Sequence, residues 1–338
     1  MKETQAGASV KDKDIDDVKV LIGVKDSMES IFLQNDETTL VLDQLDESLK
    51  FLAGNGVNKE KEAKQTKKLF DEWAGLKKLA KEVKKEIAKK VDDQSKTNKF
   101  AIDNHENALK DFHNLMKKRD FYKYETGSEQ ALVSLQSINA EIDEFIAQTE
   151  DLKYNAVKFE HPNLIEPSQV KIGEIQNEVG LMQALWDHTK ECQDTFRGFE
   201  VNTWEATNTE EMDDAVKRLE KQLKAMKVDK RSNAYIGILE ELKKWLKFIL
   251  LVGPLRDPAM RERHWQTIRD KVNVQFVLDA NLKLKDIWDL ELGRVAEDVE
   301  EVADQAVQEA KMEKSLKTIS EFWVDIKFEF AQHKNTDV

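Results

Sequence analysis

One stretch of the chain decides its fold class: residues 68–91 read KLFDEWAGLKKLAKEVKKEIAKKV. Six apolar residues in it recur at intervals of four, three, four, three and four positions, and they are Leu69, Trp73, Leu76, Ala80, Val83 and Ile87. Because an α-helix completes a turn about every 3.6 residues, this spacing places the six side chains in one stripe along a helix. The stripe predicts a long amphipathic helix that packs against partner helices.

The same period resumes further along the chain. After Val91 it is interrupted by the polar run DDQSKTNK, and it returns in residues 102–116, which include Ile102, Leu109 and Met116. These residues allow either one helix over 59–123, about 100 Å long, or two helices with a break near Ser95 to Asn98. The absence of Gly and Pro from the polar run favours one helix.

Helix-breaking residues are scarce in the whole sequence, which has 12 Gly and 4 Pro in 338 residues. No stretch shows the sustained alternation of Val, Ile and Thr that is typical of strands. Further apolar stripes follow Gly127-Ser128 and the proline pair Pro162 and Pro167. Since helices joined by short loops pack antiparallel, we expect an all-α fold of elongated antiparallel helical bundles with long amphipathic helices and no sheet.

Turn residues divide the chain into three expected segments, 1–56, 57–252 and 253–338. The first should hold two short helices separated at Asn35-Asp36-Glu37. The later segments should hold helices over 209–228 and 233–252 and a last helix from about 296 to 328. Six of the seven tryptophans lie from Trp186 onward. Large aromatic residues at helical spacing usually form core, so we expect the second half to be the better packed.

Composition excludes several function classes. Lys and Arg number 53 and Asp and Glu 66, a net charge of −13, which argues against a nucleic-acid clamp. Cys192 is the single cysteine, so neither an internal disulfide nor a zinc site made of thiolates can form, which favours a reducing compartment. The longest apolar run, 248–252, is far too short to cross a membrane, and the first residues lack the apolar core of a secretory signal.

No motif in the chain predicts catalysis, a cofactor or a metal. The sequence contains no Gly-Lys pair, so the Walker phosphate-binding loop is absent, and the Gly54-Asn55-Gly56 turn lacks the third glycine of a dinucleotide site. The weak candidates are the calcium-like spacing of Asp12, Asp14 and Asp16, the pair His105 and His113, and a reactive thiol at Cys192 one helical turn after His188. We interpret all three as ordinary surface or core residues of helices.

Charge is distributed unevenly along the chain. Residues 59–90 hold twelve Lys and six acidic residues, whereas residues 286–313 hold ten acidic residues and two basic ones. Solvated faces of a bundle explain both segments. A second interpretation is that the basic helix binds an acidic partner chain, in which case the binding would weaken with salt.

The most distinctive stretch is residues 253–265, which read GPLRDPAMRERHW. Pro254 and Pro258 disfavour helix just before them, so two helices should meet there at a rigid corner. Arg261 and Arg263 can bind carboxylates or helix carbonyls, and His264 and Trp265 combine a polar tip with an apolar body. The candidate corner is therefore the set Pro254, Pro258, Met260, Arg261, Arg263, His264 and Trp265. It is either purely structural, with a hydrogen-bonded histidine, or a joint that transmits force.

This stretch resembles the L-R-x-P-A-M-R-x-R-H-W turn of dynein heavy chains, at the start of the linker that follows the helical tail. Upstream, Trp204 and Trp245, the latter in LEELKKWLKFILLVGPL, look like the paired helices of that family. Downstream, the run from Ala306 to Trp323 is similar to the family pattern A-x-K-E-x-x-I-E-x-x-L-x-x-I-x-x-x-W, with departures at Gln308 and Met312. The resemblance covers roughly residues 60–331 and is strongest from about 180.

The resemblance implies a tail-like bundle in 57–252, the start of the linker in 253–338 and an unassigned first segment. It implies a non-catalytic segment of an ATP-driven motor, axonemal rather than cytoplasmic in class, located in the cytoskeleton of a cilium. Implied partners are dynein intermediate and light chains, other heavy chains and the motor ring of its own chain, with microtubules only indirectly and with neither nucleic acid nor membrane. We expect a fragment or truncated product of a heavy chain. The alternative is a free-standing, spectrin-like scaffold that binds partner helices.

Overall fold

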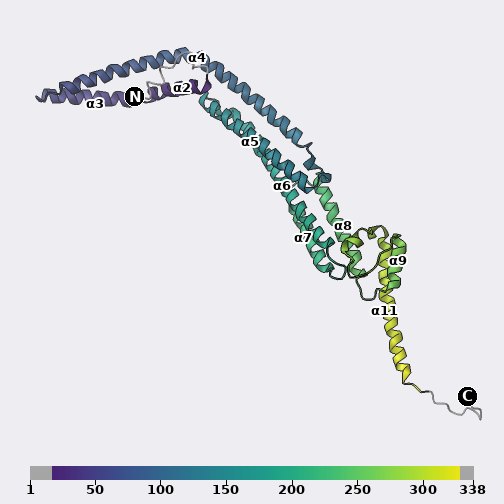
Figure 1. Cartoon of the computed structure of the whole chain (residues 1–338). Helices are drawn as coiled ribbons and strands as arrows, with labels where there is room; N and C mark the ends of the chain where they lie inside the picture. The colour runs from purple at the N-terminus through teal and green to yellow at the C-terminus, as the bar shows by residue number, and fades with distance from the viewer. Residues whose placement is uncertain (1–16, 328–338) are drawn as a thin grey trace, which may run out of the picture. The chain divides into compact units, whose positions relative to one another are not determined.

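The computed structural model describes residues 17–327 (Figure 1). Over that range the chain forms helices and no strand of a sheet, and one isolated antiparallel bridge joins Thr203 to Lys283. The prediction of an all-α fold is confirmed. The α-helices are α2 (Val18–Leu33), α3 (Asn35–Gly54), α4 (Glu60–Met116), α5 (Ser128–Lys158), α6 (Glu166–Glu200), α7 (Thr209–Ala225), α8 (Asn233–Leu255), α9 (Glu262–Val272), α10 (Leu284–Trp288) and α11 (Ala296–Val324). Short 3₁₀ helices are η1 (Asp120–Tyr122), η2 (Tyr124–Thr126), η3 (Pro162–Ile165) and η4 (Leu292–Val295).

Spatial contacts divide the chain into two compact units. The first unit comprises Met1–Asn114 and Glu141–Ile175, and the second comprises Leu115–Ala140 and Gln176–Val338. The three-segment division expected from the sequence, with boundaries at 57 and 253, remains a prediction, because it concerns domains of a family and not groupings by contact.

Helix α4 runs without interruption through the polar residues that follow Val91, so the single long helix is confirmed. Its 57 residues span about 85 Å. Two of the polar residues make useful contacts: the Lys96 ammonium pairs with Asp92 one turn earlier, and Asn98 Nδ2 lies 2.9 Å from His161 Nε2. The polar run therefore bonds to the helix and to a neighbouring segment instead of breaking the helix.

The end of α4 falls earlier than expected, at Met116 rather than near residue 123. The chain turns there because Phe121, in η1, is completely buried, and its carbonyl accepts a 2.7 Å hydrogen bond from Trp186 Nε1. If α4 continued as a helix, the Phe121 carbonyl would accept a backbone hydrogen bond within that helix and would be less available to Trp186.

The stripe of α4 forms one side of a hydrophobic core in the first unit. Trp73, Leu76, Ala80 and Ile87 are buried in it, and Leu69 and Val83 pack against it. The opposite side comes from α2, with the buried residues Leu21, Val24, Met28 and Ile31, and from α3, with Leu42. Burial of these side chains is the main force that orders α2 against α4.

The break between α2 and α3 lies at Gln34, not at Asn35-Asp36-Glu37 as expected. Those three residues instead form the first turn of α3. Negative side chains are favourable at a helix N-terminus, where the unpaired N–H groups carry partial positive charge. Asp36 and Glu37 therefore start a helix here, although the sequence pattern suggested a separator.

A second cluster of the first unit joins α4, α5 and η3 through Ile102, Ala156 and Ile165. His105 lies in the same part of α4, where its Nε2 is 2.7 Å from the hydroxyl of Thr149. The Thr149 hydroxyl donates to the carbonyl of Phe145, so it must accept from His105 Nε2–H. Burial lowers the pKa of His105, consistent with a neutral core histidine.

In the second unit, α7 and α8 pack against each other. The α7 residues Met212, Val216, Leu219 and Leu223 recur at helical spacing, and all four are buried. Side chains cap both helices: Asn208 accepts from the N–H of Glu210 and Ser232 from that of Tyr235. Helix α7 ends at Ala225 and not at 228, α8 continues past 252 to Leu255, and α11 ends at Val324.

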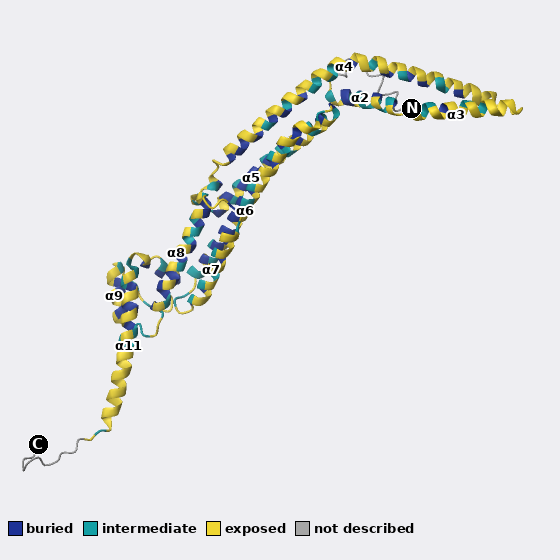
Figure 2. Cartoon of the chain, turned by 180° about the vertical axis from the view of Figure 1, so that it is seen from behind, coloured by how far each residue is buried: buried dark blue, intermediate teal, exposed yellow. Residues whose placement is uncertain are grey.

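Aromatic rings fill the core of the second unit. Trp245 stacks on Trp288 with ring centroids 4.1 Å apart and on Phe196 at 5.0 Å, while Trp186 is completely buried. The expectation that these tryptophans form core is right for them but wrong for Trp323, which is 52% exposed near the end of α11. Residues 311–325 of that helix and its cap are all exposed (Figure 2).

Candidate functional site

Helix α8 does not stop before Pro254, as the sequence predicted, but continues through it to Leu255. Proline disfavours a helical conformation of the residue before it, partly because its ring clashes with the Cβ atom of that residue. Here the preceding residue is Gly253, which has no Cβ atom. Pro254 has no N–H to donate to the carbonyl of Leu250. Because Leu250 is 70% exposed, water can bond to that carbonyl instead. The expected corner therefore begins after Leu255, three residues later than the end at 252 that the pattern suggested.

A tight turn over Asp257 to Met260 makes the corner. The N–H of Met260 bonds to the carbonyl of Asp257 at 3.0 Å, and the Asp257 carboxylate accepts from the N–H of Ala259 at 2.8 Å. Pro258 occupies the second position of this turn, where its fixed φ is favourable. The preceding residue, Arg256, donates from Nη2 to the carbonyl of Glu205 at 3.0 Å. The turn is thus held to the segment that follows α6.

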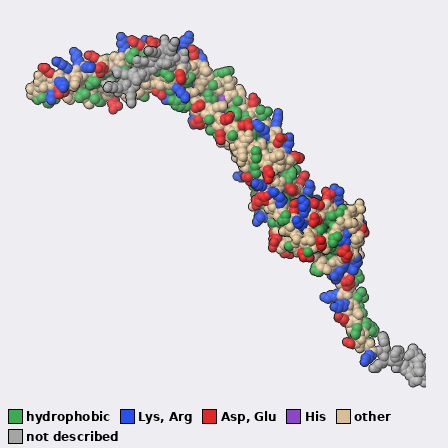
Figure 3. All heavy atoms as spheres, in the orientation of Figure 1, with side chains coloured by type: hydrophobic (Ala, Val, Ile, Leu, Met, Phe, Trp, Pro, Cys, Tyr) green, Lys and Arg blue, Asp and Glu red, His purple; other side chains and the backbone are tan. Residues whose placement is uncertain are grey.

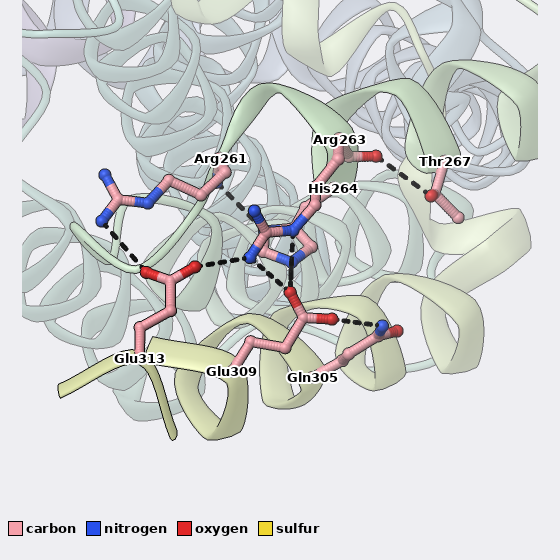
Figure 4. Close-up of polar contacts among 7 residues, drawn as sticks. All are labelled: Arg261, Arg263, His264, Thr267, Gln305, Glu309 and Glu313. Atoms are coloured by element: carbon pink, nitrogen blue, oxygen red, sulfur yellow. Dashed lines mark hydrogen bonds and ion pairs between the residues drawn. The ribbon is translucent and has the colours of Figure 1, made fainter. Parts of the chain in front are cut away.

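His264 lies at the start of α9 and is 3% exposed. Its Nδ1 accepts the backbone N–H of Arg261 at 3.0 Å, and its Nε2 lies 3.0 Å from Oε2 of Glu309 (Figure 4). An acceptor Nδ1 carries no proton, so the proton is on Nε2 and is donated to the Glu309 carboxylate. One imidazole ring therefore closes the first turn of α9 and joins it to α11.

Two arginines beside His264 reach the same face of α11. Arg263 donates from Nε to Oε2 of Glu309 at 2.8 Å and from Nη2 to Oε1 of Glu313 at 3.0 Å. Arg261 Nη2 lies 3.7 Å from Oε2 of Glu313. Figure 4 shows the three basic side chains converging on the two carboxylates from one side. We call this set of five residues the α9–α11 clamp.

Glu309 is the centre of the clamp. Hydrogen bonds from Gln305 Nε2, from Arg263 and from His264 lower the pKa of Glu309 to about 2. The Gln305 bond is 2.7 Å long and comes from the preceding turn of α11. Because every one of these donors favours the ionised form, the carboxylate remains charged at any physiological pH.

Trp265 anchors the other face of α9 in the core. Its ring is 5% exposed and meets Trp204 edge to face at 5.7 Å and Phe276 at 6.0 Å. The guanidinium of Arg269, one turn later, lies 5.0 Å from the Phe276 ring and donates to the Phe276 carbonyl at 2.7 Å. Helix α9 is therefore held by aromatic packing on one side and by the clamp on the other.

The structure brings together part of the set predicted from sequence. Arg261, Arg263 and His264 converge on α11, and Trp265 points into the core. Pro254 is exposed in the last turn of α8, and Pro258 is exposed in the tight turn that follows. Sequence reasoning did not assign Glu309 and Glu313 as their partners, and it did not single out Arg269 or Gln305. The available signal was the spacing of Glu309 and Glu313, four residues apart on one helical face of the acidic segment. The Leu69 to Ile87 stripe belongs to the first unit and is a separate feature.

Of the weaker candidates from sequence, Cys192, His105 and His113 lie within the described residues and are buried. Cys192 Sγ lies 3.6 Å from His188 Nε2, but burial raises the pKa of the thiol to about 12, so it is protonated. Among the described residues no three His, Cys, Asp or Glu side chains are grouped to hold a metal ion. Asp12, Asp14 and Asp16 lie outside the described residues. No helix in the described range has the length and apolarity to cross a membrane.

Comparisons with known proteins identify the family of the chain. The family described as "Dynein heavy chain, N-terminal region 2" matches residues 172–338. The flagellar outer-arm dynein alpha chain of Chlamydomonas reinhardtii is 30% identical over 325 residues, which are 93% of this chain and 7% of that protein. The ciliary dynein beta chain of Tripneustes gratilla is 29% identical over 280 residues, 81% of this chain and 6% of that protein.

A mammalian relative shows the same kind of match: dynein axonemal heavy chain 17 of Mus musculus is 29% identical over 171 residues, 50% of this chain and 4% of that protein. These matches define an all-helical segment of a motor heavy chain. The chain belongs to the dynein heavy chain family and corresponds to its N-terminal region. It spans less than a tenth of the length of the relatives named here.

Proposed function

We propose that this chain is a mechanical and assembly segment of an axonemal dynein heavy chain, which joins tail to linker and carries force between them without catalysing a reaction itself. The family match over residues 172–338 and the ciliary and flagellar names of the relatives support this proposal. On the same basis, the location we propose is the axoneme of a cilium.

The observation that carries the proposal is the α9–α11 clamp. Charge-assisted hydrogen bonds from Arg263 and from His264 converge on Glu309, so α9 and the first half of α11 are joined by several directional contacts. Trp265 holds α9 to the core at the same time. A load applied along the stiff helix α11 would therefore pass through α9 into the body of the second unit, and not into a flexible loop.

The proposed partners follow from membership of a heavy chain. They are intermediate and light chains, other heavy chains and the motor ring of the same polypeptide, with microtubules contacted only through that ring. A free-standing, spectrin-like scaffold is the competing proposal. The genomic sequence downstream of codon 338 distinguishes the two: six Walker-type modules there support the motor, and a genuine stop codon with a stable transcript supports the scaffold.

The direct test uses an assembled motor. The corresponding segment of the Chlamydomonas outer-arm alpha chain is replaced by this chain, and Trp265→Ala is introduced. We expect microtubule gliding to slow several-fold while ATP hydrolysis continues at its normal rate, because α9 loses its anchor. Tyr154→Ala, which removes an exposed aromatic ring of α5, is the matched control. If Trp265→Ala instead unfolds the isolated chain, or if gliding is unchanged in a folded motor, the corner is structural and the force-transmission proposal is wrong.

A further inference from the structure

Helix α3 presents more apolar surface than the described chain covers. Among its residues Leu42 is buried, whereas Leu40 is 58% exposed, Val41 49%, Leu45 44% and Phe51 72%. Leu42, Leu45, Leu49 and Leu52 recur at intervals of three and four, the spacing of a helix with partners along its length. Figures 1 and 2 show α3 beside a single stretch of α4, with exposed residues along much of both helices.

A groove of about 450 Å³ runs between α3 and α4. Val41, Leu42 and Leu45 line it from α3, and Leu69 and Trp73 line it from α4. The Nε1–H of Trp73 is buried and has no hydrogen-bond partner in the described part of the chain. A buried indole donor without an acceptor is costly, so an occupant of the groove that offers an oxygen would be favoured.

The two walls of the groove carry opposite charge. Helix α3 holds five acidic residues and one lysine, whereas residues 59–90, mostly in α4, hold twelve lysines and six acidic residues. Glu37 lines the groove on the α3 side, and the Lys77 ammonium lies 5.8 Å from the Trp73 ring on the α4 side. Figure 3 shows hydrophobic side chains interspersed with both kinds of charge over this helix pair. An occupant should therefore be apolar in the middle, basic along one edge and acidic along the other.

We propose that the α3–α4 groove is the docking site for an amphipathic helix of a partner protein, with a leucine-rich stripe flanked by a basic edge that faces α3 and an acidic edge that faces α4. A third helix completes a three-helix bundle and covers the exposed leucines. An extended peptide fits less well, since its backbone N–H groups would face apolar walls without acceptors. The proposal deepens the assembly role, on which it rests, by assigning a surface and a kind of partner.

The test uses the whole 338-residue chain and a defined probe. The probe is a synthetic helical peptide with leucine at the a and d positions, lysine along one edge and glutamate along the other. A second peptide of the same composition has its charges mixed over both edges. The chain is labelled with 5-fluorotryptophan, and Trp73→Phe assigns the one tryptophan signal that belongs to the first unit. Fluorine NMR then reports binding at the groove itself.

We expect the first peptide to shift the Trp73 signal alone and to bind about tenfold more tightly than the mixed-edge peptide. Leu45→Glu, at a half-exposed position that tolerates a polar side chain, should abolish the shift. Leu250→Glu, a 70% exposed position of α8, should leave it unchanged. Equal affinity for both peptides, or no shift at Trp73, overturns the proposal.

A second copy of this chain is the competing occupant. If ultracentrifugation shows dimers that Leu45→Glu dissociates, the partner-helix proposal is wrong and the groove is a self-association surface. Neither result depends on an attached motor. Failure here leaves the force-transmission proposal intact, and failure of the gliding experiment leaves this one intact.

Discussion

The imidazole of His264 bridges the backbone N–H of Arg261 and the carboxylate of Glu309, with both contacts 3.0 Å long. These two contacts use the two ring nitrogens in opposite roles, one as acceptor and one as donor. The ring therefore works as a bridge only in its neutral form with the proton on Nε2. The corner of the second unit depends on this tautomer.

The two halves of the bridge can be separated by substitution. His264→Asn keeps an acceptor near the position of Nδ1 but is too short to reach Glu309, whereas His264→Gln can reach Glu309 and leaves the Arg261 N–H without its acceptor. Loss of the helix-capping bond should lower the free energy of unfolding of His264→Gln by about 1 kcal/mol. Loss of the hydrogen bond to Glu309 should lower that of His264→Asn by about 1 kcal/mol. His264→Ala should cost more than either. Urea unfolding followed by tryptophan fluorescence measures all three, and an alanine variant as stable as the wild type would contradict the bridge.

The Arg263–Glu309 pair within the clamp should depend on the opposite signs of its two charges. Arg263→Glu places a carboxylate next to Glu309 and Glu313, so we expect faster hydrogen exchange of the α9 amides. Adding Glu309→Arg should restore part of the protection, because the Arg263–Glu309 pair is re-formed with reversed signs whereas His264 loses its acceptor. Lys217→Glu, which disturbs an ion pair within α7, is the control and should leave α9 unchanged. Failure of the double variant to recover protection would show that Arg263 and Glu309 act independently.

Stability should fall in acid through Glu309. Its pKa is lowered from 4.5 to about 2 by hydrogen bonds from Gln305, Arg263 and His264. A carboxyl whose pKa is depressed by folding contributes stability above its ordinary pKa and loses it as the pH falls towards the folded value. The Glu309 contribution is therefore complete above about pH 4.5 and lost between about pH 4.5 and 2. Thermal unfolding of wild type and Glu309→Gln over this range should give curves that converge at the acid end, and parallel curves would exclude the assignment.

Gly237 of α8 should not accept a side chain. A Cβ atom added there would overlap the ring of Tyr124, which lies directly on this position. The segment cannot easily withdraw, because the Tyr124 N–H bonds to Asn233 Oδ1 at 2.6 Å and its hydroxyl bonds to Glu241. Overpacking of this kind costs about 1–3 kcal/mol, so Gly237→Ala should be destabilised by that amount in urea unfolding.

The matched control for Gly237 is Gly180, in the exposed face of α6, where nothing lies near an added Cβ atom. Gly180→Ala should stabilise the chain by roughly 0.5–1 kcal/mol, since alanine restricts the unfolded state. If both variants change stability in the same direction, the close approach of Tyr124 is not the cause.

The spacing of residue types along the sequence was sufficient to predict features that depend on a single helix. The spacing from Leu69 to Ile87 predicted the face of α4 that is buried, and the lack of Gly and Pro around Ser95 favoured the continuity that α4 has. Both features depend on the 3.6-residue period and on backbone propensity, which act within one helix. The same reasoning placed Arg261, Arg263 and His264 at a corner and left carboxylates or helix carbonyls open as ligands for the arginines.

Other features depended on neighbours far away in the sequence, and there local rules were wrong or silent. Pro254 was expected to end a helix, but Gly253 before it and solvent around Leu250 allow α8 to pass through. Trp323 was expected in the core, but α11 extends past the elements that bury Trp186 and Trp245. In both cases the surroundings of the residue, and not its type, decided the result.

The amino-acid sequence by itself determined the helical fold, the buried faces of the long helices and the family to which the chain belongs, because periodicity and motifs are properties of short segments. The tertiary structure alone decided that Glu309 accepts hydrogen bonds from His264 and Arg263. It also decided that Trp73 Nε1–H finds no acceptor among the residues described and that Leu40 and Leu45 of α3 are exposed. These are pairings across space, and a pairing depends on where two helices come to lie, which no local spacing encodes.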